Sequence, residues 1–265
     1  MNVTRSCCLA IAGGDSGGNA GIQADLRTFH AYGLHGCTVF TALTAQNPFS
    51  VNAIHPVPPD FIAAQLDAVL DVYGIAALKT GMLPDVASVE AVVAKLRPFP
   101  KIAKVADPVM VATSGARLVC EDAVEALKKL LLPLADIITP NIPEAEILSG
   151  LQIKTAVDAR EAAHRLNCEY GCAVLVKGGH ATGVVAEDVL FDGEEFSSLA
   201  MPWIERPIST HGTGCALAAA ITAGLALGCS LKDAVFDAKR YVHNAIASSY
   251  FVGRDCGVLG FATKH

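Results

Sequence analysis

Short apolar segments alternate with longer amphipathic segments along almost the whole chain, and this alternation restricts the possible folds more than any other feature. The short segments are partly β-branched and are bounded by Gly, Pro or Asp, which is typical of buried strands. We expect strands at residues 7–12, 38–44, 75–78, 102–106, 137–138, 173–176 and 184–191. We expect helices at residues 21–32, 59–72, 85–96, 121–132, 143–149, 156–170, 215–227 and 231–251.

Strands that alternate with helices in this way form a mostly parallel sheet with helices on both faces. The predicted fold class is therefore α/β, a three-layer α/β/α sandwich around a mostly parallel central sheet. No linker, low-complexity segment or fixed-period repeat interrupts the 265 residues, so we expect a single domain over residues 1–265. Ligands of such sheets bind outside the carboxyl ends of the strands, which is where the informative residues should lie.

The composition excludes several classes of protein. With 52% hydrophobic and 17% charged residues, the chain can fill a core and is not disordered. Its net charge of -6 gives no reason to expect nucleic acid or an anionic membrane surface as a partner. The mean hydropathy is +0.42, but the longest apolar segment, residues 214–229, is rich in Gly and Ala and shorter than the roughly 20 residues of a membrane span. We expect that segment to be a buried helix.

The cysteines and the first residues bear on the cellular compartment. The chain has nine cysteines, an odd number, and most of them lie inside apolar segments. This pattern favours reduced, buried thiols over a disulfide framework. Residues 1–12 contain one Arg and too short an apolar stretch for a signal peptide. We therefore expect a cytoplasmic protein.

The loop after the first expected strand contains five glycines between residues 12 and 25. Glycines let a backbone and a ligand approach closely, whereas a strand-to-helix turn needs only one or two of them. The G-x-x-x-x-G-K-[ST] and G-x-G-x-x-G patterns of nucleotide-binding loops are both absent; Gly212 and Gly214 begin the second pattern, but Leu217 stands at its third glycine. A ligand-binding loop of another kind is the favoured interpretation, with a simple turn as the alternative.

Polar side chains follow two further expected strands. Gln46 follows residues 38–44, and its amide could either bind a flat heterocycle or cap the chain reversal before Pro48. Asp107 follows residues 102–106, where its carboxylate could hold Mg²⁺ beside a phosphate or serve as a helix or turn cap. Both alternatives stay open on spacing alone.

Two expected helix starts could contact anions or metals. Glu144 and Glu146 lie in the first turn of a helix that starts with Pro143, where the helix dipole alone would justify acidic residues. The segment 212–215, Gly-Thr-Gly-Cys, precedes an Ala-rich helix and can expose several backbone N–H groups in a row. Such unpaired groups bind anions, for example a phosphoryl group. Close packing of an Ala-rich helix would favour the same small residues.

Taken together, these segments resemble the hydroxymethylpyrimidine and phosphomethylpyrimidine kinases of thiamine biosynthesis, in the ribokinase-like superfamily. The motifs that carry the resemblance, in the expected order, are GGDSGGNAGIQAD (13–25), TALTAQN (41–47), KTGML (79–83), DPVMVATSG (107–115), TPNIPEAE (139–146), LVKGGH (175–180) and HGTGC (211–215). Their combination is far more specific than any single motif. The first loop departs from the family pattern, because Asp15-Ser-Gly-Gly-Asn19 stands where Asp-Pro-Ser-Gly-Gly is more frequent, and Gly14 and Thr80 also differ.

The resemblance implies an enzyme that uses ATP and Mg²⁺ to phosphorylate the hydroxymethyl group of 4-amino-5-hydroxymethyl-2-methylpyrimidine, and then the resulting monophosphate. Gln46 would read the polar edge of the ring, and the residues that would line the pyrimidine pocket are Gly13, Asp15, Ala20, Gln46, Met82 and Val109. The residues that would organise Mg²⁺ and its waters are Asp107, Asn141 and Glu144. Those that would contact the nucleotide phosphates or form the anion hole are Lys177, Gly212, Thr213 and Gly214. Family members are often homodimers, and we expect the same here.

Cys215 is the expected catalytic residue. Sugar kinases of the superfamily have an Asp at this position that takes the proton from the attacking hydroxyl, whereas the pyrimidine kinases resemble Gly-Thr-Gly-Cys. A helix N-terminus lowers the pKa of a thiol, although a nearby triphosphate opposes its ionisation. We expect Cys215 to deprotonate or orient the hydroxymethyl oxygen; the alternative is a small residue that merely fits the helix start.

Two other functions are kept as alternatives. A pyridoxal or pyridoxine kinase would phosphorylate a hydroxymethyl group on a similar flat ring with the same residues. A non-catalytic pyrimidine-binding protein is less favoured, because the expected phosphate-binding and metal-binding residues are all present. A sugar kinase is disfavoured by the thiol of Cys215.

Overall fold

The computed structural model describes residues 5–111, 118–178 and 185–262. Its main feature is a sheet of nine strands in the order β3-β2-β1-β4-β5-β6-β7-β8-β9. Neighbouring strands from β2 to β7 are parallel, whereas β3 at one edge and β8 and β9 at the other pair antiparallel. The bounds are β1 Cys7–Asp15, β2 His35–Asn47, β3 Ser50–Pro56, β4 Ile75–Thr80, β5 Ala103–Ala106, β6 Ile137–Ile138, β7 Ala173–Val176, β8 Val185–Phe191 and β9 Phe196–Pro202.

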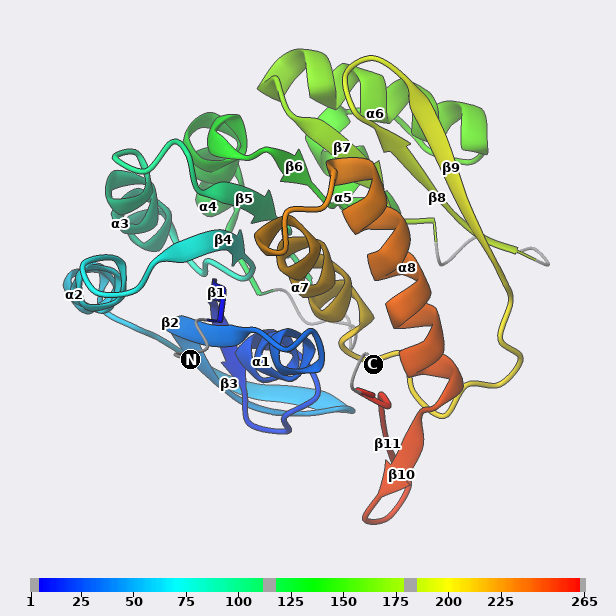
Figure 1. Ribbon diagram of the computed structural model, residues 1–265, viewed down its shortest axis with the longest axis horizontal. Coiled ribbons are helices and arrows are strands. Elements are labelled where there is room, and N and C mark those ends of the chain that lie inside the picture. The colour runs from blue at the N-terminus through cyan, green and yellow to red at the C-terminus, as the bar shows by residue number, and fades with distance from the viewer. Residues whose placement is uncertain (1–4, 112–117, 179–184, 263–265) are drawn as a thin grey trace.

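Helices cover both faces of this sheet. The sheet curves around α1, α7 and α8, while α2 to α6 lie on its other face (Figure 1). The bounds are α1 Gly21–Ala31, α2 Pro59–Leu70, α3 Val86–Leu96, α4 Glu121–Ala126, α5 Ile142–Ser149, α6 Ala156–Tyr170, α7 Thr213–Ala226 and α8 Leu231–Ala247. The predicted α/β/α sandwich with a mostly parallel sheet is confirmed.

The inner strand β1 shows why helices are needed on both faces of the sheet. Ala10 and Ala12 pack into the core that contains Phe29 of α1, whereas Leu9 and Ile11 pack into the core on the opposite face. All of these side chains are buried. Because both faces of β1 are covered, its residues 7–12 are apolar without exception instead of alternating between apolar and polar residues.

The Ala-rich segment forms α7, a buried helix, as expected. Its residues from Ala216 to Gly224 are buried without exception. A Cβ atom on Gly224 would lie 2.8 Å from the Cβ of Ala234, so the small residues allow α7 and α8 to approach closely. None of the helices in the described part of the chain combines the length and apolar character needed to cross a bilayer.

Several element boundaries differ from expectation. The last helix ends at Ala247 instead of residue 251, because Tyr250–Val252 (β10) pairs with Cys256–Val258 (β11) in a separate antiparallel hairpin. This hairpin projects from the body of the protein (Figure 1). The expected helix 121–132 begins as α4 but continues as a π-helical turn, Leu127–Leu131, and a 3-10 turn that contains a proline, Leu132–Leu134. Residue 184, at the start of an expected strand, lies outside the described residues.

Two edge strands were not expected from the sequence. Strands β3 and β9 expose many of their side chains, so neither contains the continuous apolar run that marks an inner strand.

Two helices begin one or two residues earlier than expected, α5 at Ile142 and α7 at Thr213.

Candidate active site

The carboxyl edge of the parallel sheet collects the expected site residues. Each of them either ends or follows a strand or begins a helix, in the positions that a ligand site of this fold requires. The positions are Gly13 and Asp15 at the end of β1, Ala20 before α1, Gln46 at the end of β2, Met82 after β4, Asp107 and Val109 after β5, Asn141 and Glu144 at the start of α5, Lys177 after β7, and Gly212, Thr213, Gly214 and Cys215 at the start of α7.

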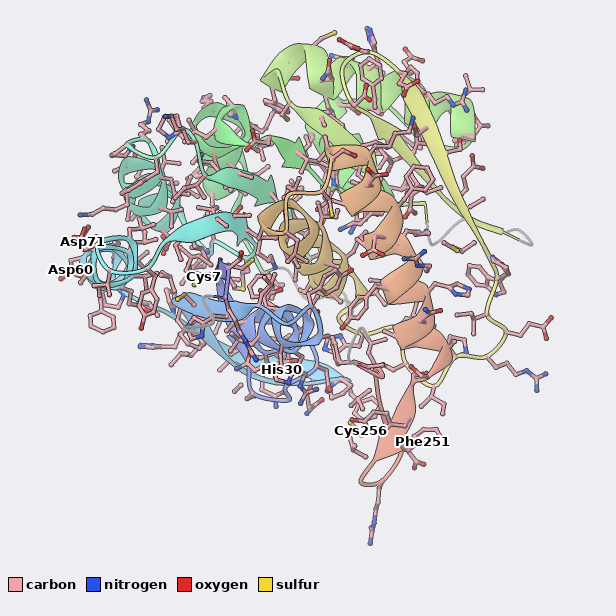
Figure 2. All side chains as sticks on the ribbon, in the orientation of Figure 1. Cys7, His30, Asp60, Asp71, Phe251 and Cys256 are labelled. Atoms are coloured by element: carbon pink, nitrogen blue, oxygen red, sulfur yellow. The ribbon has the colours of Figure 1, made fainter. Side chains whose placement is uncertain are left out.

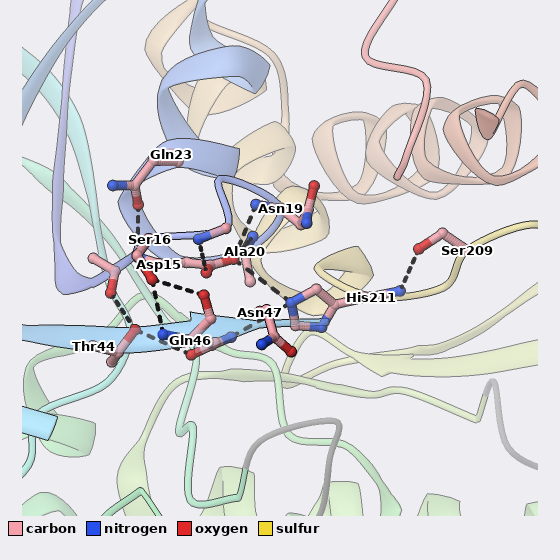
Figure 3. A network of polar contacts seen from close by, with 12 residues as sticks. Asp15, Ser16, Asn19, Ala20, Gln23, Thr44, Gln46, Asn47, Ser209 and His211 are labelled. Atoms are coloured by element: carbon pink, nitrogen blue, oxygen red, sulfur yellow. Dashed lines mark hydrogen bonds and ion pairs between the residues drawn. The ribbon is translucent and has the colours of Figure 1, made fainter. Parts of the chain in front are cut away.

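The carboxylate of Asp15 organises the glycine-rich loop. One oxygen accepts a hydrogen bond from the N–H of Gly17 at 2.8 Å, and the other accepts from Asn19 at 2.9 Å and Ala20 at 2.8 Å (Figure 3). Burial alone would raise the pKa of Asp15, but the hydrogen bonds from the His211 side chain and from these backbone groups lower it. The carboxylate is therefore ionised and holds the loop in one shape.

Gln46 is fixed at the end of β2, beside this loop. Its backbone N–H donates to the hydroxyl of Ser16 at 2.8 Å, and the same hydroxyl donates to the Gln46 carbonyl at 2.7 Å. Its side-chain oxygen accepts from the Thr44 hydroxyl at 3.3 Å. The amide nitrogen of Gln46 lies 3.5 Å from Nε2 of His211 (Figure 3). The hydrogen bond from Thr44 orients the side-chain oxygen of the Gln46 amide.

His211 lies between the glycine-rich loop, Gln46 and the start of α7, and no role for it was predicted from the sequence. Its Nε2 lies 3.6 Å from the carboxylate of Asp15, whereas its Nδ1 is buried and has no hydrogen-bond partner in the described part of the chain. The only signal in the sequence was its position directly before Gly212 and Gly214. A histidine next to an anion-binding turn is a natural candidate for contact with ligand.

The start of α7 presents free backbone donors. Gly212 is the N-cap, with φ of +87°, and no side chain caps this end of the helix. Within the described residues, the N–H groups of Gly214 and Cys215 have no hydrogen-bond acceptor. A Cβ on Gly212 would overlap the carbonyl oxygen of Asn19, so the glycine-rich loop packs directly against the helix start. The expected anion site is thus open and lies beside the expected substrate loop.

An ion pair lies at the same helix start. The Lys177 ammonium is 2.8 Å from the carboxylate of Asp107, which also accepts a hydrogen bond from the Thr139 hydroxyl at 3.1 Å. A Cβ on Gly214 would lie 3.4 Å from Nζ of Lys177 and 3.9 Å from Oδ2 of Asp107. Burial alone would lower the pKa of Lys177, but Asp107 and Glu144 raise it, so the lysine keeps its charge. Positive charge therefore adjoins the free N–H groups of α7.

Glu144 and Asn141 form a capping box at the start of α5. The Asn141 side chain accepts from the Glu144 N–H at 2.9 Å, and the Glu144 carboxylate accepts from the Asn141 N–H at 2.9 Å. Burial, together with the negative charge of Asp107, raises the pKa of Glu144 to about 7 against the opposing effect of Lys177. In this conformation Asn141 holds Glu144 in place. The carboxylates of Glu144 and Asp107 repel one another.

Cys215 interacts electrostatically with a buried ion pair. Lys79 and Asp25 are fully buried and 2.9 Å apart. Burial raises the pKa of the Cys215 thiol to about 11, although Lys79 and the N–H of Gly21 act in the opposite direction. The thiol is therefore protonated at neutral pH, which favours the orienting role over a resting thiolate base. The ion pair was missed from the sequence, where a lysine at the end of an apolar strand was its only signal.

The remaining expected pocket residues lie between these groups. A Cβ on Gly13 would be 3.0 Å from the sulfur of Met82, so these two residues are in close contact. Ala20 precedes α1 and is held by Asp15, while Val109 is partly exposed and its N–H donates to the Asp107 carbonyl at 2.8 Å. The small and apolar residues thus occupy the same edge as the amide of Gln46.

The sequence comparisons identify the family to which this chain belongs. The sequence model that describes phosphomethylpyrimidine kinases matches residues 15–260, nearly the whole chain. The chain belongs to the phosphomethylpyrimidine kinase family. A hydroxymethylpyrimidine/phosphomethylpyrimidine kinase of Rhizobium meliloti is 48% identical over 244 residues, which cover 91% of this chain and 90% of the relative.

The chain is also similar to a longer bifunctional protein and to a solved structure. A thiamine biosynthesis bifunctional protein of Geobacter sulfurreducens is 47% identical over 253 residues; these cover 96% of this chain, which spans only 51% of that protein. The crystal structure of an ADP complex of Bacillus subtilis pyridoxal kinase superposes with a TM-score of 0.91 at 37% identity and covers 98% of both chains. The phosphomethylpyrimidine kinase family member therefore has the predicted ribokinase-like fold.

Proposed function

We propose that this chain is an ATP-dependent kinase of thiamine biosynthesis that phosphorylates 4-amino-5-hydroxymethyl-2-methylpyrimidine and then its monophosphate. The observation that supports this proposal best is the arrangement at the start of α7. Free N–H groups of Gly214 and Cys215 lie at the helix start beside the Lys177 ammonium. Together these donors would form a cradle for phosphate oxygens. In phosphoryl transfer, positioning and charge stabilisation of this kind provide most of the catalysis.

Gln46 would select the ring of the substrate. Its amide has one donor side and one acceptor side, which match the amino group and ring nitrogen of an aminopyrimidine. Gly13 and Met82 would contact the flat faces of the ring, because a glycine without a side chain leaves room beside the thioether. Asp15 would act indirectly by fixing the loop that includes Ala20.

The residues at β5 and α5 fit a magnesium ion. Asp107 and Glu144 supply the hard carboxylate oxygens that Mg²⁺ prefers, and their mutual repulsion is what a divalent cation would relieve. Asp107 and Glu144 would hold the ion together with waters, while Asn141 fixes the position of Glu144. When bound, Mg²⁺ supplies neutralisation of the phosphate charge.

Cys215 would orient the hydroxymethyl oxygen toward the phosphorus. Its thiol stands at the helix start where the transferred group would lie, and its raised pKa keeps it neutral beside a triphosphate. The substrate oxygen forms a bond to phosphorus, the bond to the ADP oxygen breaks, and the hydroxyl proton leaves to solvent or to a nearby group. A neutral orienting group suffices, because the loose transition state needs little base assistance.

A steady-state assay with ATP, Mg²⁺ and the pyrimidine alcohol tests the proposal when the mono- and diphosphate products are resolved. We expect both products, and we expect chelation of the metal to abolish their formation. Pyridoxal serves as the competing substrate, because the solved relative from Bacillus subtilis is a pyridoxal kinase. Turnover of pyridoxal with none of the pyrimidine alcohol would replace the assignment, and tight pyrimidine binding without ATP consumption would favour a binding protein.

We also propose that the kinase is a homodimer. Large apolar side chains are exposed on β2 and on the turn that follows it, with Leu43 50% and Phe49 69% exposed, and such surfaces are often covered by a partner. Light scattering should then give about twice the chain mass of 27.5 kDa. Phe49→Asp should shift the protein to a monomer, whereas Val157→Asp, at an equally exposed position on α6, should not. A monomeric mass for the wild type would contradict the proposal.

A further inference from the structure

Two cysteines and a histidine converge at the amino-terminal ends of β1 and β2, whereas the candidate active site lies at the carboxyl ends of the strands. The sulfur atoms of Cys7 and Cys37 are 3.4 Å apart. With a ring nitrogen of His35 they form a cluster whose candidate ligand atoms all lie within 4.8 Å of one another. No other group of three His, Cys, Asp or Glu side chains in the described part of the chain meets this spacing.

The parallel register of β1 and β2 brings these side chains together. Cys7 pairs with His35, and Cys37 is two residues further along the same face of β2. Both cysteines are buried, whereas His35 is exposed and its ring stacks on Tyr73 at 5.7 Å between centroids. Figure 2 labels Cys7 at the start of β1. The stacking restricts the ring of the one exposed member of the cluster.

A disulfide does not account for this convergence. An offset of two residues along the strands, combined with the spacing between strands, places the two Cα atoms about 8 Å apart. Disulfides rarely bridge Cα atoms that are more than about 7 Å apart. The cysteines therefore approach at their sulfur atoms while their backbones remain too distant for an unstrained bond.

We propose that Cys7, His35 and Cys37 bind one Zn²⁺ ion, with water as the fourth ligand. Tetrahedral zinc takes sulfur at about 2.3 Å and nitrogen at about 2.0 Å, which places two sulfur ligands roughly 3.8 Å apart. The observed sulfur separation needs to open by only a few tenths of an ångström. Each thiol loses its proton to solvent as its sulfur–zinc bond forms, so binding releases two protons.

The electrostatics of the cluster suit a divalent cation. Two thiolates in the apolar core around Leu9 and Val39 would be strongly unfavourable by themselves. Zn²⁺ balances both charges, and the partly open side at His35 provides a route for the ion.

The zinc site is separate from the candidate active site. Cys7 begins β1 and Asp15 ends it, so the two sites lie about 26 Å apart along the strand. Zinc would tie the starts of two neighbouring inner strands together, and the proposal does not depend on the kinase function.

Zinc titration of the full-length protein under reducing conditions, with a chromophoric chelator as competitor, tests the proposal. We expect one ion per chain at this site with a Kd below about 1 μM. His35→Ala and Cys37→Ala should each weaken binding at least about tenfold. Cys168→Ala is the matched control, because Cys168 also has a histidine neighbour, with Nδ1 of His164 3.8 Å from its sulfur, but lacks a third ligand. The control should bind zinc like the wild type.

A second measurement covers the chance that Cys37→Ala folds poorly. His35 is exposed, so His35→Ala should keep the wild-type melting temperature without metal. Zinc should raise the melting temperature of the wild type and of Cys168→Ala, and should not raise that of His35→Ala. Cobalt should give thiolate charge-transfer absorption in the wild type that is lost in Cys37→Ala. Weak binding by the wild type, or zinc affinity that is unchanged in both site variants, would overturn the proposal.

Discussion

Cys215 is the residue on which the proposed chemistry is most directly testable. A protonated thiol that orients the hydroxymethyl oxygen can be replaced in part by a hydroxyl but not by a methyl group. We therefore expect Cys215→Ala to lower kcat by about 100-fold and Cys215→Ser to lower it less. Steady-state rates at saturating ATP and pyrimidine alcohol measure the effect, and Cys256→Ala, which removes another partly exposed thiol, is the control. Turnover close to wild type in both variants would mean that Cys215 merely fits the helix start.

Glu144 should make stability depend on pH. Its pKa is about 7 in the folded protein and near 4.5 when unfolded, so the folded state holds an extra proton between these values. This stabilising contribution is complete below pH 4.5 and is lost as the pH rises through 7, by an amount on the order of 3 kcal/mol.

Urea denaturation of the metal-free protein at pH 5 and pH 8 measures this effect. Glu144→Gln is the comparison, because glutamine can keep the capping box but does not titrate. We expect the wild type to lose stability relative to Glu144→Gln between these pH values. Parallel pH profiles of the two proteins would show that Glu144 has an ordinary pKa.

At the start of helix α7, replacement of Gly212 or Gly214 by alanine should have different effects on stability and activity. Gly212→Ala places a methyl group against the Asn19 carbonyl at a positive φ, so it should cost about 1–3 kcal/mol of stability and reduce activity. Gly214→Ala adds a methyl group in ordinary contact with Lys177, whose end can move. It should keep the melting temperature but raise the KM for ATP, because it narrows the phosphate cradle.

Thermal melts and ATP saturation curves of the two variants distinguish these effects. Equal loss of stability in both variants would contradict the packing of the glycine-rich loop on α7. An unchanged KM for ATP in a stable Gly214→Ala protein would place the phosphates elsewhere.

The inner strands and the buried helices could be predicted from the sequence, because their burial requires apolar or small residues along most of their length. Strands such as β1 and helices such as α7 have compositions that only a covered position explains. The edge strands β3 and β9 could not be predicted, because exposed edges tolerate polar residues and depend on their neighbours for pairing. The end of α8 was misplaced because Tyr250 and Phe251 continue its apolar pattern while their backbones pair with β11.

The positions of the candidate site residues could be predicted where those residues end a strand or begin a helix. Gln46, Asp107 and Gly214 follow strands or precede a helix, and the chain order alone brings such positions to one edge. The roles of His211 and of the pair Lys79 and Asp25 depend on contacts between residues far apart in the chain. A single sequence does not contain those distances.

For the whole molecule, nucleotide binding should appear as thermal stabilisation. A ligand present at 100 times its Kd adds about 2.7 kcal/mol, which corresponds to roughly 5–10 °C for a chain of this size. We expect ADP with Mg²⁺ to produce such a shift in the wild type and a much smaller one in Lys177→Met. Lys239→Met is the matched control, because Lys239 forms a similarly buried ion pair with Asp188 on β8. Equal shifts in both variants would exclude Lys177 from the nucleotide site.

The β10–β11 hairpin offers a place to attach a reporter. Its turn contains Gly253 and Asp255 at positive φ, and the strand before the turn is exposed along its whole length. Exposed loop tips that project from the body accept inserted sequence with little cost to folding. A short labelling peptide placed between Gly253 and Asp255 would therefore carry a fluorophore without touching either edge of the main sheet.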